Sequence, residues 1–91
     1  MKWVELIRVR SSADAVKEAI PSLKEKISEI SQSTNAEETF MAHHALYDGD
    51  LSVVVVWNND ADPIKSREGL LLAEQLQQLG PVDHAVWIPV K

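Results

Sequence analysis

Glu5 is the first residue along the chain whose side chain and position suit it to proton transfer. It lies between Trp3 and Ile7 in an N-terminal run of strand-forming residues. A carboxylate on a covered apolar face is poorly solvated, which suits it to acid/base chemistry. Glu5 is therefore a candidate catalytic residue. The alternative, which we favour, is a structural hydrogen bond or salt bridge across a sheet or to a partner subunit.

The histidines, His43, His44 and His84, offer imidazole groups but do not predict a metal site. Neighbouring residues on a strand face opposite ways, so His43 and His44 cannot readily hold one ion together. Zinc usually takes three or four protein ligands, and the chain lacks a glycine-rich phosphate loop. We therefore expect no metal and no cofactor. His43 is a second candidate catalytic residue, because it would act as a proton acceptor if it shared a face with Glu5.

The aromatic residues Trp3, Tyr47, Trp57 and Trp87 are candidates for lining a ligand pocket. Such pockets are mostly apolar with a few polar groups. The alternative for the tryptophans is the core of a protein interface, where tryptophan is enriched. The sequence favours the interface.

The elements expected to carry these residues follow the order strand, helix, strand, strand, helix, strand. Apolar residues spaced by four, three, four and three from Val16 to Ile30 predict the first helix, and Pro21 predicts a kink in it. The second helix begins after Asp62 or Ser66 and stops at Gly80. We expect strands at residues 3–9, 39–47, 51–57 and 84–90, with the first and third in the centre of one antiparallel sheet.

The segment 48–50, Asp-Gly-Asp, predicts a tight hairpin turn with positive backbone angles. Two registers remain open. If Tyr47 pairs with Leu51, then His43 and Tyr47 join the face that carries the tryptophans. A two-residue turn would bring His44 to that face instead.

Alternation along the strands separates two faces of the sheet. We expect the even positions of the first, third and fourth strands to pack on the helices, because they are largely aliphatic: Val4, Leu6, Val54, Val56, Val86, Ile88 and Val90. The odd positions include Glu5 and all three tryptophans. That second face is too apolar for water, so we expect a partner sheet to cover it in a homodimer.

Length and charge limit the classes of function. The 91 residues allow one domain, residues 1–91, with one core. The net charge of −5 opposes binding to nucleic acid or to an anionic membrane surface. The longest apolar run, residues 53–57, is too short to span a membrane, and no cysteine or signal-peptide pattern is present. We expect a cytoplasmic protein.

The element order, the helical segment Ile20-Pro21-Ser22-Leu23, the run from Val53 to Asn58 and the apolar closing strand resemble the dimeric α/β-barrel superfamily, including antibiotic-biosynthesis monooxygenase-like proteins. The resemblance implies an α+β, ferredoxin-like βαββαβ fold with a four-stranded antiparallel sheet and two helices on one face. It implies two sheets paired in a dimeric barrel, with a small-molecule pocket between the helices and the sheet. The segment 63–69 departs from such proteins, which often carry a histidine there.

Two functions follow as hypotheses. The first is a homodimer that binds a small apolar ligand, with cofactor-free monooxygenase or isomerase chemistry at Glu5 and His43. The second is a non-catalytic regulatory or assembly module whose tryptophan face is a protein interface.

Overall fold

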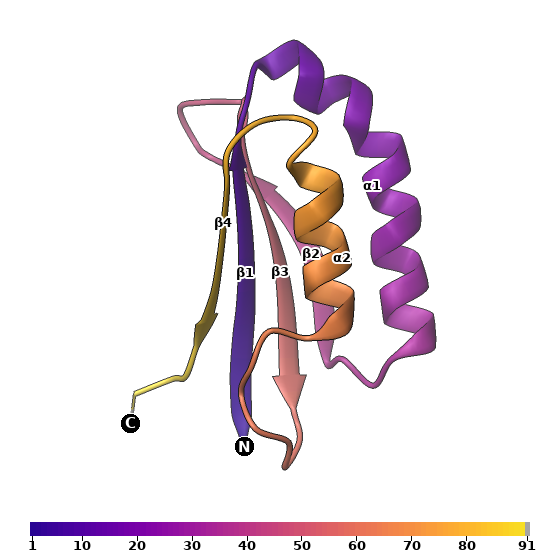
Figure 1. Ribbon diagram of the computed structural model, residues 1–91, viewed down its shortest axis with the longest axis vertical. Helices are drawn as coiled ribbons and strands as arrows, with labels where there is room; N and C mark the ends of the chain where they lie inside the picture. Colours follow the sequence, from indigo (N-terminus) through magenta and orange to yellow (C-terminus); the bar gives the residue numbers. More distant parts are fainter. Residues whose placement is uncertain (91) are drawn as a thin grey trace.

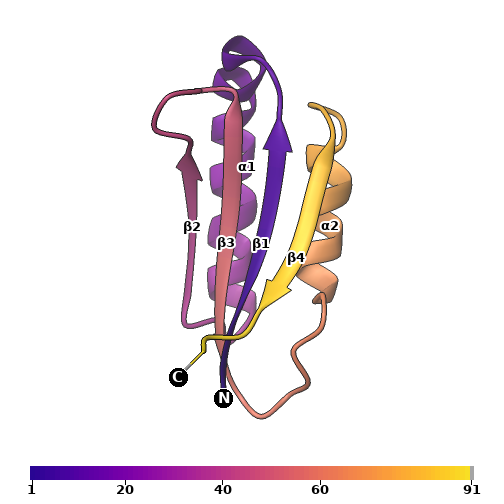
Figure 2. The same cartoon turned by 90° about the vertical axis from the view of Figure 1, so that its left-hand side faces the viewer.

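The computed structural model describes residues 1–90 and has the predicted βαββαβ order (Figure 1). The elements are β1 (Lys2–Arg10), α1 (Ala13–Ser33), β2 (Glu38–His43), β3 (Asp50–Asn58), α2 (Arg67–Leu76) and β4 (Val82–Trp87). The strands form one antiparallel sheet in the order β2-β3-β1-β4. Both helices cover the same face of this sheet, and the other face is open (Figures 1 and 2). The ferredoxin-like fold and the central position of β1 and β3 are thus confirmed.

Helix α1 is capped by the side chain of Ser12, which accepts a hydrogen bond from the Ala15 amide at 3.1 Å. Pro21 lies inside the helix. In Figure 1 the first turns of α1 cross the end of the sheet and the remainder runs along it, the change of direction expected from a proline that removes one backbone hydrogen bond. No helix within residues 1–90 is long and apolar enough to cross a membrane.

The prediction of which sheet face packs against the helices was wrong. The odd positions of β1 and β3 are the buried ones, from Trp3 to Val9 and from Leu51 to Trp57. Four of them, Ile7, Val9, Leu51 and Val53, pack beneath residues of both helices: Val16, Leu23, Ile30, Leu72 and Leu76. Trp3, Val55 and Trp57 form a second cluster. On β1 and β3 the alternation was read correctly, but both faces are apolar, so alternation alone could not show which one meets the helices. On β4 the even position Val86 does lie on the helix side, as expected.

Because the odd positions of β1 and β3 face the helices, two of the three tryptophans cannot form the expected protein interface. Trp3 and Trp57 are 3% and 5% exposed within the single chain, so a partner protein does not bury them. Trp87 differs, because β4 pairs with β1 in a register that places it opposite Val4. Trp87 therefore lies on the open face and is 60% exposed.

The β2–β3 connection is longer than predicted. His43 pairs with Leu51, and residues 44–49 form the loop. No residue in 1–90 has a positive backbone φ angle, so the expected turn geometry is absent. Gly49 is required for a different reason: a Cβ there would lie 2.1 Å from the Ser11 carbonyl oxygen. The Ser11 amide also donates to the Gly49 carbonyl at 2.8 Å, so the hairpin loop is fastened to the start of α1.

Candidate functional site

Glu5 is completely buried on β1, beneath the N-terminal end of α2. Its carboxylate binds three groups. Trp57 Nε1 donates to Oε1 at 2.9 Å, the Ser66 amide donates to Oε2 at 3.2 Å, and His84 Nε2 lies 2.7 Å from Oε2. A buried carboxylate requires such partners, since leaving it without them would be strongly unfavourable. We call Glu5, Trp57, Ser66 and His84 the Glu5 cluster.

The cluster is assembled from four elements that are distant in the sequence. Trp57 lies near the end of β3, and Ser66 caps α2 by accepting from the Gly69 amide at 2.9 Å. On β4, Val86 is opposite Glu5, so His84 is its diagonal neighbour on the same face. The carboxylate also lies at the α2 N-terminus, where the aligned peptide dipoles favour a negative charge. Sheet register and helix capping together position the cluster.

Gly69 makes room for the cluster on the side of the helix. A Cβ built at this position would lie 2.1 Å from Glu5 Oε2 and 3.1 Å from His84 Cε1. Such separations are far below van der Waals contact, so every residue larger than glycine would displace the carboxylate. A glycine on the buried side of a helix allows either close packing or room for a ligand. The structure shows close packing against the Glu5–His84 pair.

The orientation of the His84 ring follows from its contact with Glu5. At 2.7 Å from a carboxylate oxygen, Nε2 is the nitrogen that carries the hydrogen and donates it. The side chain of His84 is 6% exposed. Nδ1 is buried and has no hydrogen-bond partner among residues 1–90. The pair thus resembles the arrangement in which a carboxylate fixes an imidazole so that its other nitrogen accepts a proton.

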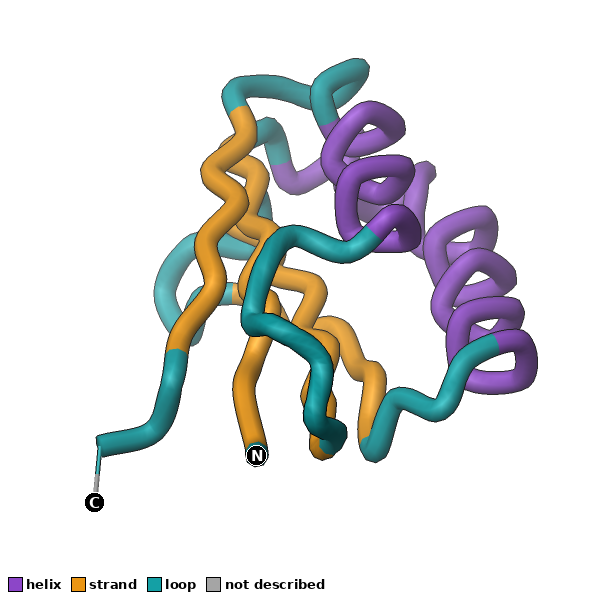
Figure 3. The backbone as a smooth tube through the Cα atoms, turned by 60° about the horizontal axis from the view of Figure 1, so that its bottom comes forward, coloured by secondary structure: helices purple, strands orange, loops and turns teal. Residues whose placement is uncertain are grey.

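Beside the cluster, Trp3 and Trp57 stack with ring centroids 5.6 Å apart. Residues 59–66 run from β3 to α2 across the end of the space between sheet and helices (Figure 3). Trp3 Nε1 donates to Asn59 Oδ1 at 3.2 Å, which ties this loop to the tryptophans. Together they form a hollow of about 360 Å³, which we call the tryptophan hollow; its lining residues are Trp3, Trp57, Asn59, Ala61, Asp62, Ile64, Lys65 and Ser66.

The structure separates His43 and Tyr47 from Glu5. His43 shares its row of the sheet with Leu51 and Val9, four residues along β1 from Glu5, which corresponds to roughly 13 Å. Its Nδ1 contacts the His44 carbonyl at 2.9 Å, and its side chain is 61% exposed. Tyr47 is 62% exposed in the hairpin loop. Proton transfer between Glu5 and His43 is therefore excluded by distance in this chain.

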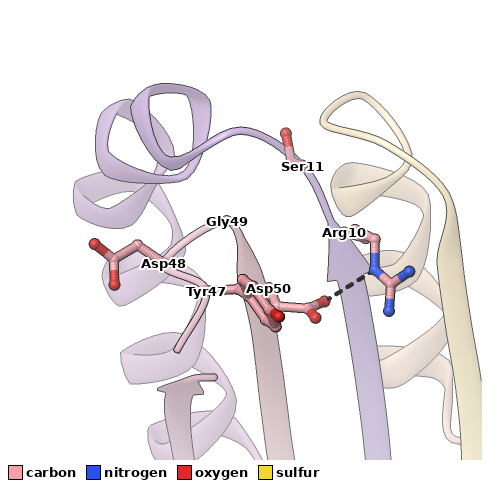
Figure 4. A pocket seen from close by; sticks show the side chains of 6 residues that line it. All are labelled: Arg10, Ser11, Tyr47, Asp48, Gly49 and Asp50. Atoms are coloured by element: carbon pink, nitrogen blue, oxygen red, sulfur yellow. Dashed lines mark ion pairs between the residues drawn. The ribbon is translucent and has the colours of Figure 1, made fainter. Parts of the chain in front are cut away.

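Tyr47 instead borders a separate hollow of about 650 Å³ at the opposite end of β1 (Figure 4). There Arg10 Nε lies 3.7 Å from Asp50 Oδ1. Arg10 is five residues from Glu5 on a strand, roughly 16 Å, so this hollow and the Glu5 cluster are independent.

His84 is the member of the cluster that sequence reasoning did not connect to Glu5. It was considered only as a metal ligand, and no group of three or more potential metal-binding side chains occurs in residues 1–90. The signal was the alternation of His84 with Val86. The even positions of β4 were grouped with the even positions of β1. The register instead places even positions of β4 on the same face as odd positions of β1.

The fold and the Glu5 cluster together define a two-layer, ferredoxin-like domain with a buried carboxylate–imidazole pair. Solved structures of this fold include Rv0793 from Mycobacterium tuberculosis, 18% identical, covering 100% of this chain and 97% of that one at a TM-score of 0.71. An antibiotic biosynthesis monooxygenase is 10% identical over 100% of both chains, with a TM-score of 0.70. A variant of SnoaB, a cofactor-independent oxygenase from Streptomyces nogalater, is 12% identical over 99% and 94%, with a TM-score of 0.68.

No protein-family model and no curated protein sequence matches the chain. At these identities the structural likeness establishes a shared fold. It confirms, at that level, the resemblance to antibiotic-biosynthesis monooxygenase-like proteins that the sequence suggested.

Proposed function

We propose that this chain is a homodimeric, cofactor-free monooxygenase that binds a small, partly apolar molecule in the tryptophan hollow. The observation that carries the proposal is the burial of Glu5 one hydrogen bond behind the wall of that hollow. Trp57 and Ser66 both line the hollow and both donate to the Glu5 carboxylate. The names of proteins with the same fold, one of them a cofactor-independent oxygenase, support the reaction class.

The chemistry assigned to Glu5 is removal of a proton from the bound molecule. A general base of this kind accelerates a reaction by about 10²- to 10⁴-fold. The Ser66 amide is the weakest of the three contacts at 3.2 Å, so an opening at Ser66 would turn Oε2 toward the hollow. His84 takes the place that the sequence analysis gave to His43, because His84 touches Glu5.

This role of Glu5 is tested by comparing Glu5→Gln with the unchanged protein. With small aromatic phenols as substrates, we expect Glu5→Gln to bind within about 3-fold but to consume oxygen at least about 100-fold more slowly, because a general base is lost. In a Trp87→Phe background, emission comes from Trp3 and Trp57 alone and reports binding in the hollow. Oxygen uptake that is unchanged in Glu5→Gln would contradict the assignment, and substrate rearrangement without oxygen uptake would indicate an isomerase.

The dimer is proposed to form through the open sheet face. This face carries the half-buried residues Val4, Leu6, Val54 and Val56, together with Phe40 and Trp87, which are 40% and 60% exposed. A single-chain domain of this size rarely leaves so continuous an apolar surface in water. The surface is self-complementary in a two-fold dimer, where the same patch on each copy meets the other.

A charge at the centre of this face should separate the copies. Val54→Lys is expected to convert a particle of about twice 10.2 kDa into one of 10.2 kDa, measured by light scattering at low micromolar concentration. Leu71→Lys is the matched control, since Leu71 is an apolar helix residue, 54% exposed, on the other side of the molecule. If both variants keep the mass of the unchanged protein and that mass is monomeric, the open face is not a homodimer interface.

A further inference from the structure

A third hollow, distinct from the tryptophan hollow and from the one beside Arg10, lies between α2 and the edge strand β4. Its volume is about 690 Å³, and its lining residues are Lys65, Leu70, Ala73, Glu74, Gln77, Val82, Asp83 and His84. We call it the α2–β4 hollow. It shares only Lys65 with the lining of the tryptophan hollow. It is thus a separate surface, and it adjoins the Glu5 cluster through His84.

His84 lines this hollow, and one of its ring nitrogens is buried without a partner among residues 1–90. Nε2 is engaged by Glu5 at 2.7 Å, and Cε1 faces Gly69, as its 3.1 Å separation from a Cβ built there shows. Nδ1 is buried and unpaired among residues 1–90, in a side chain that is 6% exposed. A buried acceptor without a donor destabilises a protein, so any group that donates to it is stabilising.

The remaining lining limits which group that is. Leu70, Ala73 and Val82 supply apolar contact surface. Glu74 and Asp83 outnumber Lys65, so the charged side chains of the lining are net negative, which opposes an anion. A neutral donor on an apolar body matches these surroundings, whereas a carboxylate or phosphate does not.

We propose that the α2–β4 hollow is a binding site for a small neutral molecule that carries one hydroxyl on an apolar body, and that this hydroxyl donates to His84 Nδ1. Glu5 acts here as a positioning residue, because its carboxylate keeps the hydrogen on Nε2 and leaves the lone pair on Nδ1. The site does not depend on the tryptophan hollow and stands whether or not the chain is an oxygenase.

The test uses two matched fluorinated probes, 4-fluorophenol and 4-fluoroanisole, followed by ¹⁹F NMR on the full-length protein. They differ in that the anisole lacks the hydroxyl donor. We expect 4-fluorophenol to bind about 10-fold more tightly, the ratio that one hydrogen bond of ordinary strength produces. In methyl-labelled protein, 4-fluorophenol should shift the resonances of Ala73 and Val82. Equal affinities for the two probes, or no binding of 4-fluorophenol at millimolar concentration, would overturn the proposal.

His84→Gln isolates Nδ1, because the glutamine amide replaces the Nε2 donor toward Glu5 but places no acceptor at the Nδ1 position. We expect this variant to lose about 10-fold in affinity for 4-fluorophenol and to leave 4-fluoroanisole unchanged. If the variant does not fold, the methyl shifts in the unchanged protein decide the matter. Shifts confined to the methyl groups of Ala61 and Ile64 would place the probe in the tryptophan hollow, overturning this site while supporting the proposed function.

Discussion

Replacing Gly69 with alanine is expected to destabilise the domain by about 3 kcal/mol, although the same change in an ordinary helix stabilises it by about 0.5–1 kcal/mol. The reason is that the new Cβ would lie 2.1 Å from Glu5 Oε2. The carboxylate would have to leave its place, which weakens its bonds to Trp57 and His84. Urea unfolding followed by circular dichroism measures the change in the free energy of unfolding directly. A decrease indicates the clash with Glu5, whereas an increase is the behaviour of an ordinary helix position.

A double variant provides the control. Glu5→Ala removes the atoms that the Gly69→Ala methyl group would strike, so the second change should be harmless, or slightly stabilising, in a Glu5→Ala background. The two changes should therefore be non-additive, with a coupling of about 2–3 kcal/mol, as expected for residues in direct contact. Equal effects of Gly69→Ala in both backgrounds would show that Gly69 is required for a reason other than the space occupied by Glu5.

Removal of the Glu5 side chain has the second large expected effect. Glu5→Ala leaves Trp57 Nε1, the Ser66 amide and His84 Nε2 without their acceptor in a buried place. Breaking a buried polar pair in this way destabilises a protein by about 3–5 kcal/mol. A domain of 91 residues has a total free energy of unfolding of about 5–14 kcal/mol, so this is a large share of it.

Two variants make that measurement interpretable. Glu38→Ala removes an exposed glutamate from β2 and should change the free energy of unfolding by less than about 0.5 kcal/mol. Glu5→Gln retains one acceptor oxygen and should lose only about 1–3 kcal/mol. Should Glu5→Ala be no less stable than Glu38→Ala, the bonds to Glu5 contribute nothing to folding and the account of the cluster is wrong.

The sequence predicted the element order and the central strands, because these depend on local patterns. Apolar spacing and the cap at Ser66 each act within a few residues. Helix α2 ends at Leu76, before the expected stop at Gly80. The layer to which each sheet face belongs depends on contacts between distant elements. Both faces of β1 and β3 are apolar, so no local signal distinguished them.

The site was predictable in part for the same reason. Glu5 between Trp3 and Ile7 identifies a buried carboxylate from the sequence alone. Its partner His84 lies 79 residues away and meets it only through the register of β4 on β1. A one-residue difference in that register would turn His84 to the open face and Trp87 to the helix side. The same register explains why Trp87, grouped with the other tryptophans by parity, faces away from them.

The buried Glu5–His84 pair adjoins two different surfaces from which a ligand could reach it. The tryptophan hollow adjoins Glu5 through Trp57 and Ser66, and the α2–β4 hollow adjoins His84. Gly69 has no side chain, so the backbone of α2 packs directly against the pair and holds both residues in place. The geometry of the pair is therefore common to the two sites.

The protonation of the His84 ring nitrogens, read from nitrogen–proton correlation NMR of the full-length protein, tests this geometry most directly. His84→Gln assigns the signals, and Glu5→Gln shows their dependence on the carboxylate. From the 2.7 Å contact with Glu5 we expect the hydrogen on Nε2, a bare Nδ1, and a change in both signals in Glu5→Gln. A hydrogen on Nδ1, or His84 signals that are unchanged in Glu5→Gln, would contradict it.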